Sequence, residues 1–167
     1  MQSLSRSGRR APRRISGEGR LPIEDGVFEH WPGFLTSIEA SRYCQALSEK
    51  VPWTTPRVRL YGRWLDSPRQ AAWYGDPGTV YRYSGTVNQP LVWLAELTEL
   101  RERLAAFFGR AFNSVLLNHY RTGADSMGWH SDDEPELGPV PMIASLSLGG
   151  PRRFLLRHRQ RKDLPVH

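Results

Sequence analysis

The chain has 167 residues, 39% of them hydrophobic, which suits one domain with enough apolar side chains to bury a sizeable core. Its single cysteine, Cys44, cannot form an internal disulfide, and no apolar run is long enough for a signal peptide or a membrane span. We therefore expect a cytoplasmic protein without a membrane partner. The net charge of +6 is concentrated at the ends, because residues 1–20 carry six Arg and one Glu and residues 152–163 carry six Arg or Lys and one Asp. A basic balance of this kind favours a polyanionic partner such as nucleic acid.

The N-terminal part of the chain predicts a tail followed by a helix. Residues 1–20 are Arg, Ser, Gly and Pro with almost nothing apolar to bury, so we expect a disordered basic tail. Thr36-Ser37-Ile38-Glu39 forms a capping box and predicts a helix that ends near Lys50, before Pro52. The buried side of this helix is predicted from apolar residues at helical spacing, which are Ala40, Tyr43, Cys44, Leu47 and Val51.

Strand-like alternation and a second helix follow. The segment from Val58 to Trp64 predicts two strands joined by a tight turn at Gly62, with an aromatic residue beside the tip that could also pack on its own sheet. A further strand is expected from Thr79 to Ser84. Pro90 suits the first turn of a second helix, which Gly109 would close.

The most informative stretch runs from Leu116 to Leu148. Asn118 and Tyr120 would share one face of a strand, and so would His130 and Asp132, because successive strand side chains point to opposite faces. An imidazole and a carboxylate joined by a second histidine would form a 2-His-1-carboxylate site for Fe(II). A calcium loop is excluded, because the sixth and twelfth positions counted from Asp132 are not the Gly and Glu that an EF-hand requires.

The order of these elements predicts an α+β fold. Two helices precede a region that reads as strands and turns and that includes the alternating segment Ile143–Leu148. This order favours a double-stranded β-helix, or jelly roll, backed by helices, in a single domain over residues 21–167.

The sequence resembles the AlkB family of Fe(II)- and 2-oxoglutarate-dependent nucleic-acid dealkylases, most closely the branch that repairs duplex DNA. The resemblance extends from about Val58 to Arg157. Three blocks carry it, namely Tyr61-Gly62-Arg63-Trp64 through Pro68-Arg69, Tyr74-Gly75-Asp76 through Tyr81-Arg82-Tyr83-Ser84-Gly85, and Asn118-His119-Tyr120 through His130-Ser131-Asp132-Asp133-Glu134.

The resemblance implies an oxidative DNA repair enzyme. His130 and Asp132 would be catalytic metal ligands for Fe(II), and Asn118 and Tyr120 would bind 2-oxoglutarate, with O2 as the second co-substrate. The reaction would remove N-alkyl groups from DNA bases and release formaldehyde and succinate.

It also implies contacts with DNA and with an extruded base. Tyr61 matches an apolar wedge that fills the gap left by the base, and Arg69 matches a DNA-contacting arginine. The remaining residues with an implied substrate role are Tyr81, Tyr83 and Ser84 in the base pocket, and Asp133 and Glu134 at the Watson-Crick edge of the base.

The chain departs from the family pattern at its C-terminal end. In the family a distal histidine and 2-oxoglutarate-binding arginines come well beyond the His-x-Asp, whereas this chain has 35 residues after Asp132. His158 and His167 do not align with the distal histidine. We therefore expect a C-terminally truncated, monomeric member that lacks the closing strands and binds DNA, with RNA left open. The alternative is a catalytically dead remnant that serves as a nucleic-acid-binding module.

Overall fold

The computed structural model describes residues 19–60, 62–79, 81–83, 86–132, 137–138 and 140–167. It divides into two compact units, one formed by residues 43–147 and the other by the stretches before Tyr43 and after Ser147. The two helices in the described part have 14 residues each, and neither is long and apolar enough to cross a bilayer, which needs about 20 apolar residues.

Helix α1 (Ser37–Lys50) begins at the predicted capping box. The backbone N–H of Thr36 donates to Oε2 of Glu39 at 2.8 Å, and the backbone N–H of Glu39 donates to Oγ1 of Thr36 at 3.2 Å. Two free N–H groups at the helix start are thereby satisfied. Tyr43, Leu47 and Val51 are buried, which confirms the predicted apolar side of the helix.

Helix α2 (Ala95–Phe108) begins five residues later than Pro90, so the predicted start was wrong. The reason is a sheet contact. Leu91 pairs with Tyr74, its N–H donating to the carbonyl of Trp73 at 2.9 Å, which keeps the segment extended. The predicted end is confirmed, because Gly109 adopts φ 64° and its N–H donates to Ala105.

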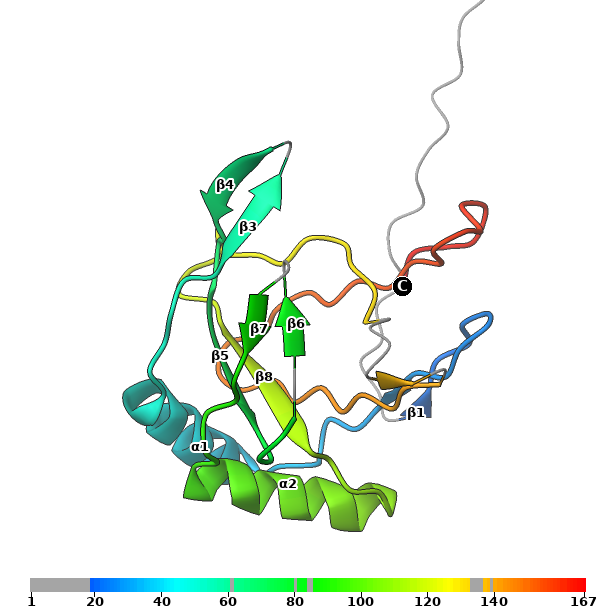
Figure 1. Cartoon of the computed structure of the whole chain (residues 1–167). Coiled ribbons are helices and arrows are strands. Elements are labelled where there is room, and N and C mark those ends of the chain that lie inside the picture. Colours follow the sequence, from blue (N-terminus) through cyan, green and yellow to red (C-terminus); the bar gives the residue numbers. More distant parts are fainter. Residues whose placement is uncertain (1–18, 61, 80, 84–85, 133–136, 139) are drawn as a thin grey trace, which may run out of the picture. The chain divides into compact units, whose positions relative to one another are not determined.

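A two-stranded antiparallel sheet forms the centre of the 43–147 unit (Figure 1). Strand β5 (Gln70–Gly75) pairs with β8 (Ser114–His119), so that Ala71 faces Asn118 across the sheet. The other edge of β5 is covered by bridges from Thr54 and from the segment before α2. Strand β5 is largely buried as a result, which makes it a rigid support for its neighbours.

A polar cluster anchors α2 to the turn after β5. Oδ1 of Asp76 accepts hydrogen bonds from Nε1 of Trp93 at 2.9 Å and from Nη1 of Arg101 at 2.8 Å. The guanidinium of Arg101 also stacks over the Trp93 ring, 4.4 Å from its centroid. The ends of the two helices are joined by an ion pair between Lys50 and Glu96.

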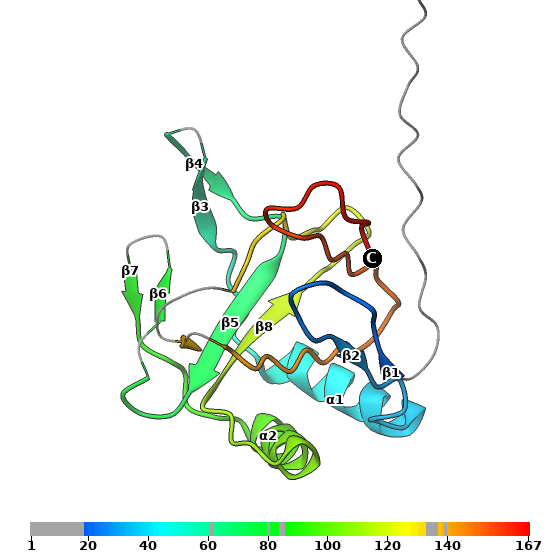
Figure 2. The same ribbon diagram turned by 90° about the vertical axis from the view of Figure 1, so that its right-hand side faces the viewer.

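Two hairpins extend from this unit. The first consists of β3 (Arg57–Leu60) and β4 (Arg63–Asp66), and it projects on the side away from the helices (Figures 1 and 2). Gly62 in its turn has φ 78°, as the predicted tight turn requires. The second consists of β6 (Tyr81–Tyr83) and β7 (Thr86–Asn88).

The other unit contains a short strand pair and a C-terminal loop. Strand β1 (Gly19–Arg20) pairs with β2 (Glu29–His30), so the predicted tail extends two residues too far, and its residues 1–18 lie outside the described part. The rings of Phe28 and Phe154 lie 5.9 Å apart. Leu156 and His167 exchange two backbone hydrogen bonds of 2.8 and 2.9 Å, which close the C-terminal loop.

The described residues form four two-stranded antiparallel sheets and two helices, an α+β arrangement without a closed barrel. The predicted strand Ile143–Leu148 is not paired in any of these sheets, and this prediction was wrong for the described structure. The predicted alternation is present, because Leu146 and Leu148 are half-buried while Ser145 and Ser147 are exposed. Alternation reports which side chains are covered, whereas a strand also needs a neighbouring backbone to bond with.

Candidate active site

Strand β8 places its neighbouring residues Asn118 and His119 on opposite faces, because successive strand side chains alternate. The ring of His119 lies 5.0 Å from that of Trp53, and its Nδ1 lies 3.1 Å from Oε1 of Gln70. Asn118 and Tyr120 are half-buried. Tyr120 follows the end of the strand, so the face that it would share with Asn118 stays a prediction.

The side chain of Arg69 is turned inward and contacts Asn118. Its Nε–H donates to Oδ1 of Asn118 at 2.7 Å, and its Nη1 donates to Oγ of Ser67 at 2.9 Å. Arg69 is 6% exposed and Ser67 is 3% exposed. The structure thus gives Arg69 intramolecular partners, and its contact with DNA stays a prediction.

The loop that follows β8 is fastened by a residue that sequence reasoning missed. Asp125, which is buried, accepts hydrogen bonds from the backbone N–H and Nε of Arg121 and from Nη2 of the same side chain, at 2.8–3.0 Å. The hydrogen bond to Asp125 raises the pKa of Arg121 above its ordinary value. The N–H of Ser126 donates to the carbonyl of Pro68 at 2.9 Å, which ties the loop to the residue before Arg69. The i, i+4 spacing of Arg121 and Asp125 was the available signal.

His130 and Asp132 lie in an irregular segment and not on a strand, so the predicted local structure was wrong. Their side chains nevertheless converge, with Nε2 of His130 3.6 Å from Oδ1 of Asp132. Nδ1 of His130 lies 2.9 Å from the carbonyl oxygen of Gly128. Because a carbonyl only accepts, Nδ1 donates this hydrogen bond, and Nε2 is the ring nitrogen that faces the carboxylate. The hydrogen bond to the Gly128 carbonyl, and not a pleated strand, orients the imidazole.

This donor pair fits part of a metal site. Two ligands at right angles on one ion, each about 2.1 Å away, lie about 3 Å apart, close to the observed separation. An imidazole nitrogen and a carboxylate oxygen suit Fe(II). No cluster of three His, Cys, Asp or Glu side chains occurs in the described parts of the chain, so these residues supply two ligands.

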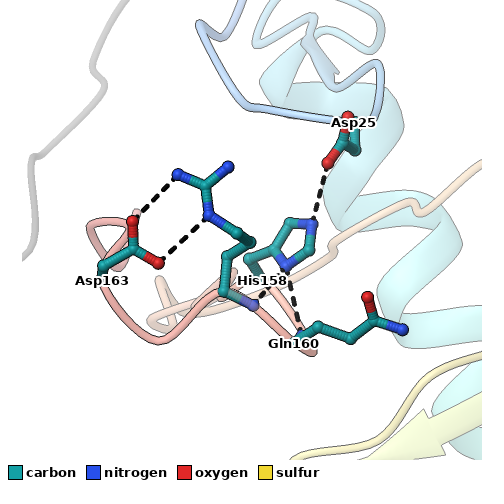
Figure 3. A network of polar contacts seen from close by, with 5 residues as sticks. Asp25, His158, Gln160 and Asp163 are labelled. Atoms are coloured by element: carbon teal, nitrogen blue, oxygen red, sulfur yellow. Dashed lines mark hydrogen bonds and ion pairs between the residues drawn. The ribbon is translucent and has the colours of Figure 1, made fainter.

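His158 is engaged in a different network (Figure 3). Its Nδ1 accepts the backbone N–H groups of Gln160 at 3.2 Å and Arg161 at 2.8 Å. The proton must then lie on Nε2, which donates to Oδ2 of Asp25 at 3.2 Å. Neither ring nitrogen has a lone pair to offer a metal ion in this arrangement, in agreement with the expectation that His158 is not the third ligand.

The remaining predicted substrate residues lie mostly outside the described structure. For the base pocket, the backbone of Tyr81 and Tyr83 is described as part of β6. The positions outside the described residues are Tyr61, Ser84, Asp133 and Glu134.

The first hairpin presents an exposed cationic and aromatic surface next to the predicted wedge. Trp64 and Leu65 are each 48% exposed. The guanidinium of Arg57 lies over the Trp64 ring, 6.0 Å from its centroid, and pairs with Asp66 at 3.6 Å. The alternative in which the aromatic at the tip packs on its own sheet concerns Tyr61, which lies outside the described residues, so that alternative stays open.

Comparison with known proteins gives consistent matches. Residues 28–167 match the family model of the 2OG-Fe(II) oxygenase superfamily. Over 124 residues the chain is 40% identical to the human DNA oxidative demethylase ALKBH2, covering 72% of this chain and 48% of that protein. Over 159 residues it is 41% identical to the alpha-ketoglutarate-dependent dioxygenase alkB homolog 3 of Rattus norvegicus, covering 87% of this chain and 53% of that protein. The chain spans about half the length of the curated relatives it matches.

Proposed function

Because the chain belongs to the 2OG-Fe(II) oxygenase superfamily, we propose that this protein oxidatively removes alkyl groups from N-alkylated bases in DNA, using Fe(II), 2-oxoglutarate and O2. The observation that carries the proposal is the convergence of His130 and Asp132, with the imidazole proton held by Gly128 on the far side of the ring. The relatives named as DNA oxidative demethylases support DNA as the substrate. The family also supports a jelly roll as the complete fold.

The metal would be held by Nε2 of His130 and a carboxylate oxygen of Asp132. The carboxylate balances charge on the cation, and the Gly128 carbonyl keeps the imidazole in the tautomer that can bind. When bound, iron couples the decarboxylation of 2-oxoglutarate by O2 to oxidation of a nearby C–H bond. One oxygen atom enters succinate and the other hydroxylates the N-alkyl carbon, and an N-methyl base then loses formaldehyde.

Asn118 and Tyr120 would bind 2-oxoglutarate. Asn118 lies near the end of β8 and Tyr120 directly follows it, and this strand is held in place by the buried strand β5. Donors on a rigid strand can hold a small dianion in one orientation without much further loss of freedom. Binding by a rigid element therefore places the co-substrate reproducibly beside the metal ligands.

The DNA-contacting roles are proposed for the hairpins and the acidic run. Tyr61, which comes between β3 and β4 in the sequence, would fill the gap left by an extruded base. The exposed Trp64 and Arg57 belong to the first hairpin. Tyr81, Tyr83 and Ser84 would line the base pocket. Asp133 and Glu134 would contact the Watson-Crick edge of the base.

A second candidate function is nucleic-acid binding without catalysis. It is favoured by residues 152–163, whose six Arg and Lys residues are all exposed, and by the presence of only two metal ligands in the described residues. Binding of this kind would be sensitive to salt, because contacts with phosphates release counterions.

The test measures formaldehyde and succinate from an N-methylated oligonucleotide in the presence of Fe(II) and 2-oxoglutarate. We expect both products in equal amounts, and neither from Asp132→Ala. Salt-sensitive DNA binding with no product in a protein extended to the full length of its relatives would favour the binding module. Undiminished turnover by Asp132→Ala would refute the metal assignment.

A further inference from the structure

Arg69 is a buried cation whose described partners are uncharged. The amide of Asn118 and the hydroxyl of Ser67 accept its hydrogen bonds, and within the described residues no carboxylate lies at ion-pair distance from it. A guanidinium does not lose its proton in a protein, so burial cannot be relieved by neutralisation. A buried charge of this kind is stabilised when an anion binds beside it.

The contact with Arg69 also determines which way the Asn118 amide points. Arginine has donors only, so the oxygen of the amide must face Arg69 and the NH2 group must point elsewhere. Asn118 then presents two N–H donors near a fixed positive charge. An NH2 group and a guanidinium both offer only donor hydrogens, so together they form a site for an anionic acceptor.

We propose that Arg69 is a positioning residue for the co-substrate: it orients the Asn118 amide so that its NH2 group donates to a carboxylate of 2-oxoglutarate, and its charge attracts that carboxylate. This rests on the proposed function. The low exposure of Arg69 favours a small dianion over a DNA phosphate, because a phosphate within a polymer reaches a side chain that is only 6% exposed less readily than a small molecule does. Arg69 is placed for this role by the register of β5 and β8, in which Ala71 faces Asn118.

The first measurement needs no cofactor. In an NMR spectrum of the chain, the Nε–H signal of Arg69 should be resolved and protected from solvent exchange, and Asn118→Ala should remove that protection. Arg101, which binds Asp76, supplies a control signal that should not change. An unprotected Arg69 signal in the parent chain would overturn the proposal.

The second measurement is the affinity for 2-oxoglutarate with Mn(II) in place of iron, followed by tryptophan fluorescence. Arg69→Gln should weaken binding by about tenfold to a hundredfold, as expected for losing a hydrogen bond and a charge. Arg69→Lys should not restore it, because Lys lacks the planar fork that fixes the amide. Asn118→Asp should keep the parent melting temperature, because the new carboxylate can pair with Arg69, but it should lose affinity for 2-oxoglutarate. The control Arg101→Gln should retain the parent affinity for 2-oxoglutarate.

The outcomes separate the two proposals. Parent-like affinity in Arg69→Gln, or full rescue by Arg69→Lys, would overturn the positioning role and leave the proposed function standing. Loss of DNA affinity with unchanged 2-oxoglutarate affinity would overturn it and assign Arg69 to the phosphate backbone. These affinities are measured in a protein extended to the full length of its relatives, and failure of that protein to bind 2-oxoglutarate would overturn the proposed function itself.

Discussion

His130 and Asp132 place Nε2 and Oδ1 3.6 Å apart, while the opposite ring nitrogen of His130 lies 2.9 Å from the carbonyl of Gly128. The second contact makes Nδ1 the donor, because a carbonyl oxygen only accepts, and it favours the orientation in which Nε2 faces Asp132. This arrangement supports the proposal that the pair chelates a metal ion.

Substituting Asp132→Ala should weaken Mn(II) binding by at least about a hundredfold, because the site loses its negative ligand and its chelate. Electron paramagnetic resonance titration of free Mn(II) measures this. His158→Asn and His119→Gln are matched controls, since both histidines are engaged elsewhere, and they should bind Mn(II) as the parent does. Parent-like affinity in Asp132→Ala, or a large loss in His158→Asn, would contradict the assignment of the metal ligands.

Substituting Tyr61→Ala should slow dealkylation of duplex DNA more than that of single strands. A wedge offsets part of the unstacking cost, about a few kcal/mol per base step, which a duplex imposes and a single strand does not. The measurement is the ratio of initial rates on the same methylated sequence with and without its complement. Equal slowing on both substrates would show that Tyr61 does not act as a wedge.

Substituting Tyr74→Phe should raise the free energy of unfolding by about 1 kcal/mol, since the ring stays and a buried hydroxyl is removed. Tyr74 is 2% exposed, and its hydroxyl has no hydrogen-bond partner in the described part of the structure. Urea denaturation at neutral pH measures the change. Tyr74→Leu is the control for lost ring volume, and it should lower stability.

The difference in the free energy of unfolding between the parent protein and Tyr74→Phe should increase at alkaline pH. Burial raises the pKa of Tyr74 above the ordinary value of 10.0. The free energy of unfolding of the parent protein is therefore unaffected by this group below pH 10, and it falls as pH rises from 10 through the folded-state pKa, because the unfolded chain ionises first. The advantage of Tyr74→Phe should widen above about pH 10. A difference that does not change with pH would contradict the burial of this hydroxyl.

Substituting His158→Asn should keep the hydrogen bonds to the Gln160 and Arg161 amides but lose the contact with Asp25, whereas His158→Gln should do the reverse. Each lost hydrogen bond reduces local stability by about 1 kcal/mol. Amide hydrogen exchange should show protection of Gln160 and Arg161 retained in the Asn variant and reduced in the Gln variant. Asp25→Ala should leave both amides protected. Equal protection in the Asn and Gln variants would contradict the tautomer inferred for His158.

Several features of the molecule follow from residues that are close in sequence. The capping box needs only Thr36 and Glu39, the end of α2 needs only Gly109, and the first hairpin needs alternation around Gly62. His130 and Asp132 belong to this class as well. The prediction placed them on a strand, whereas they lie in an irregular segment. Their side chains still converge, because two residues separated by a single residue can meet in either conformation.

Other features depended on where distant segments meet. Arg69 and Asn118 are 49 residues apart, and His158 and Asp25 are 133 apart, so no local pattern marks either pair. The late start of α2 also depended on such a contact, because Leu91 bonds to β5 before the helix can form. A short-range hydrogen bond needs only the conformation of a few neighbouring residues, whereas a long-range contact requires loop closure and one strand register, which are decided by the packing of the whole unit. The sequence by itself determined the local features, and it predicted His130 and Asp132 as metal ligands and Asn118 as a co-substrate contact. The tertiary structure alone decided that the buried Arg69 would donate to Asn118, because that contact depends on the packing of distant segments.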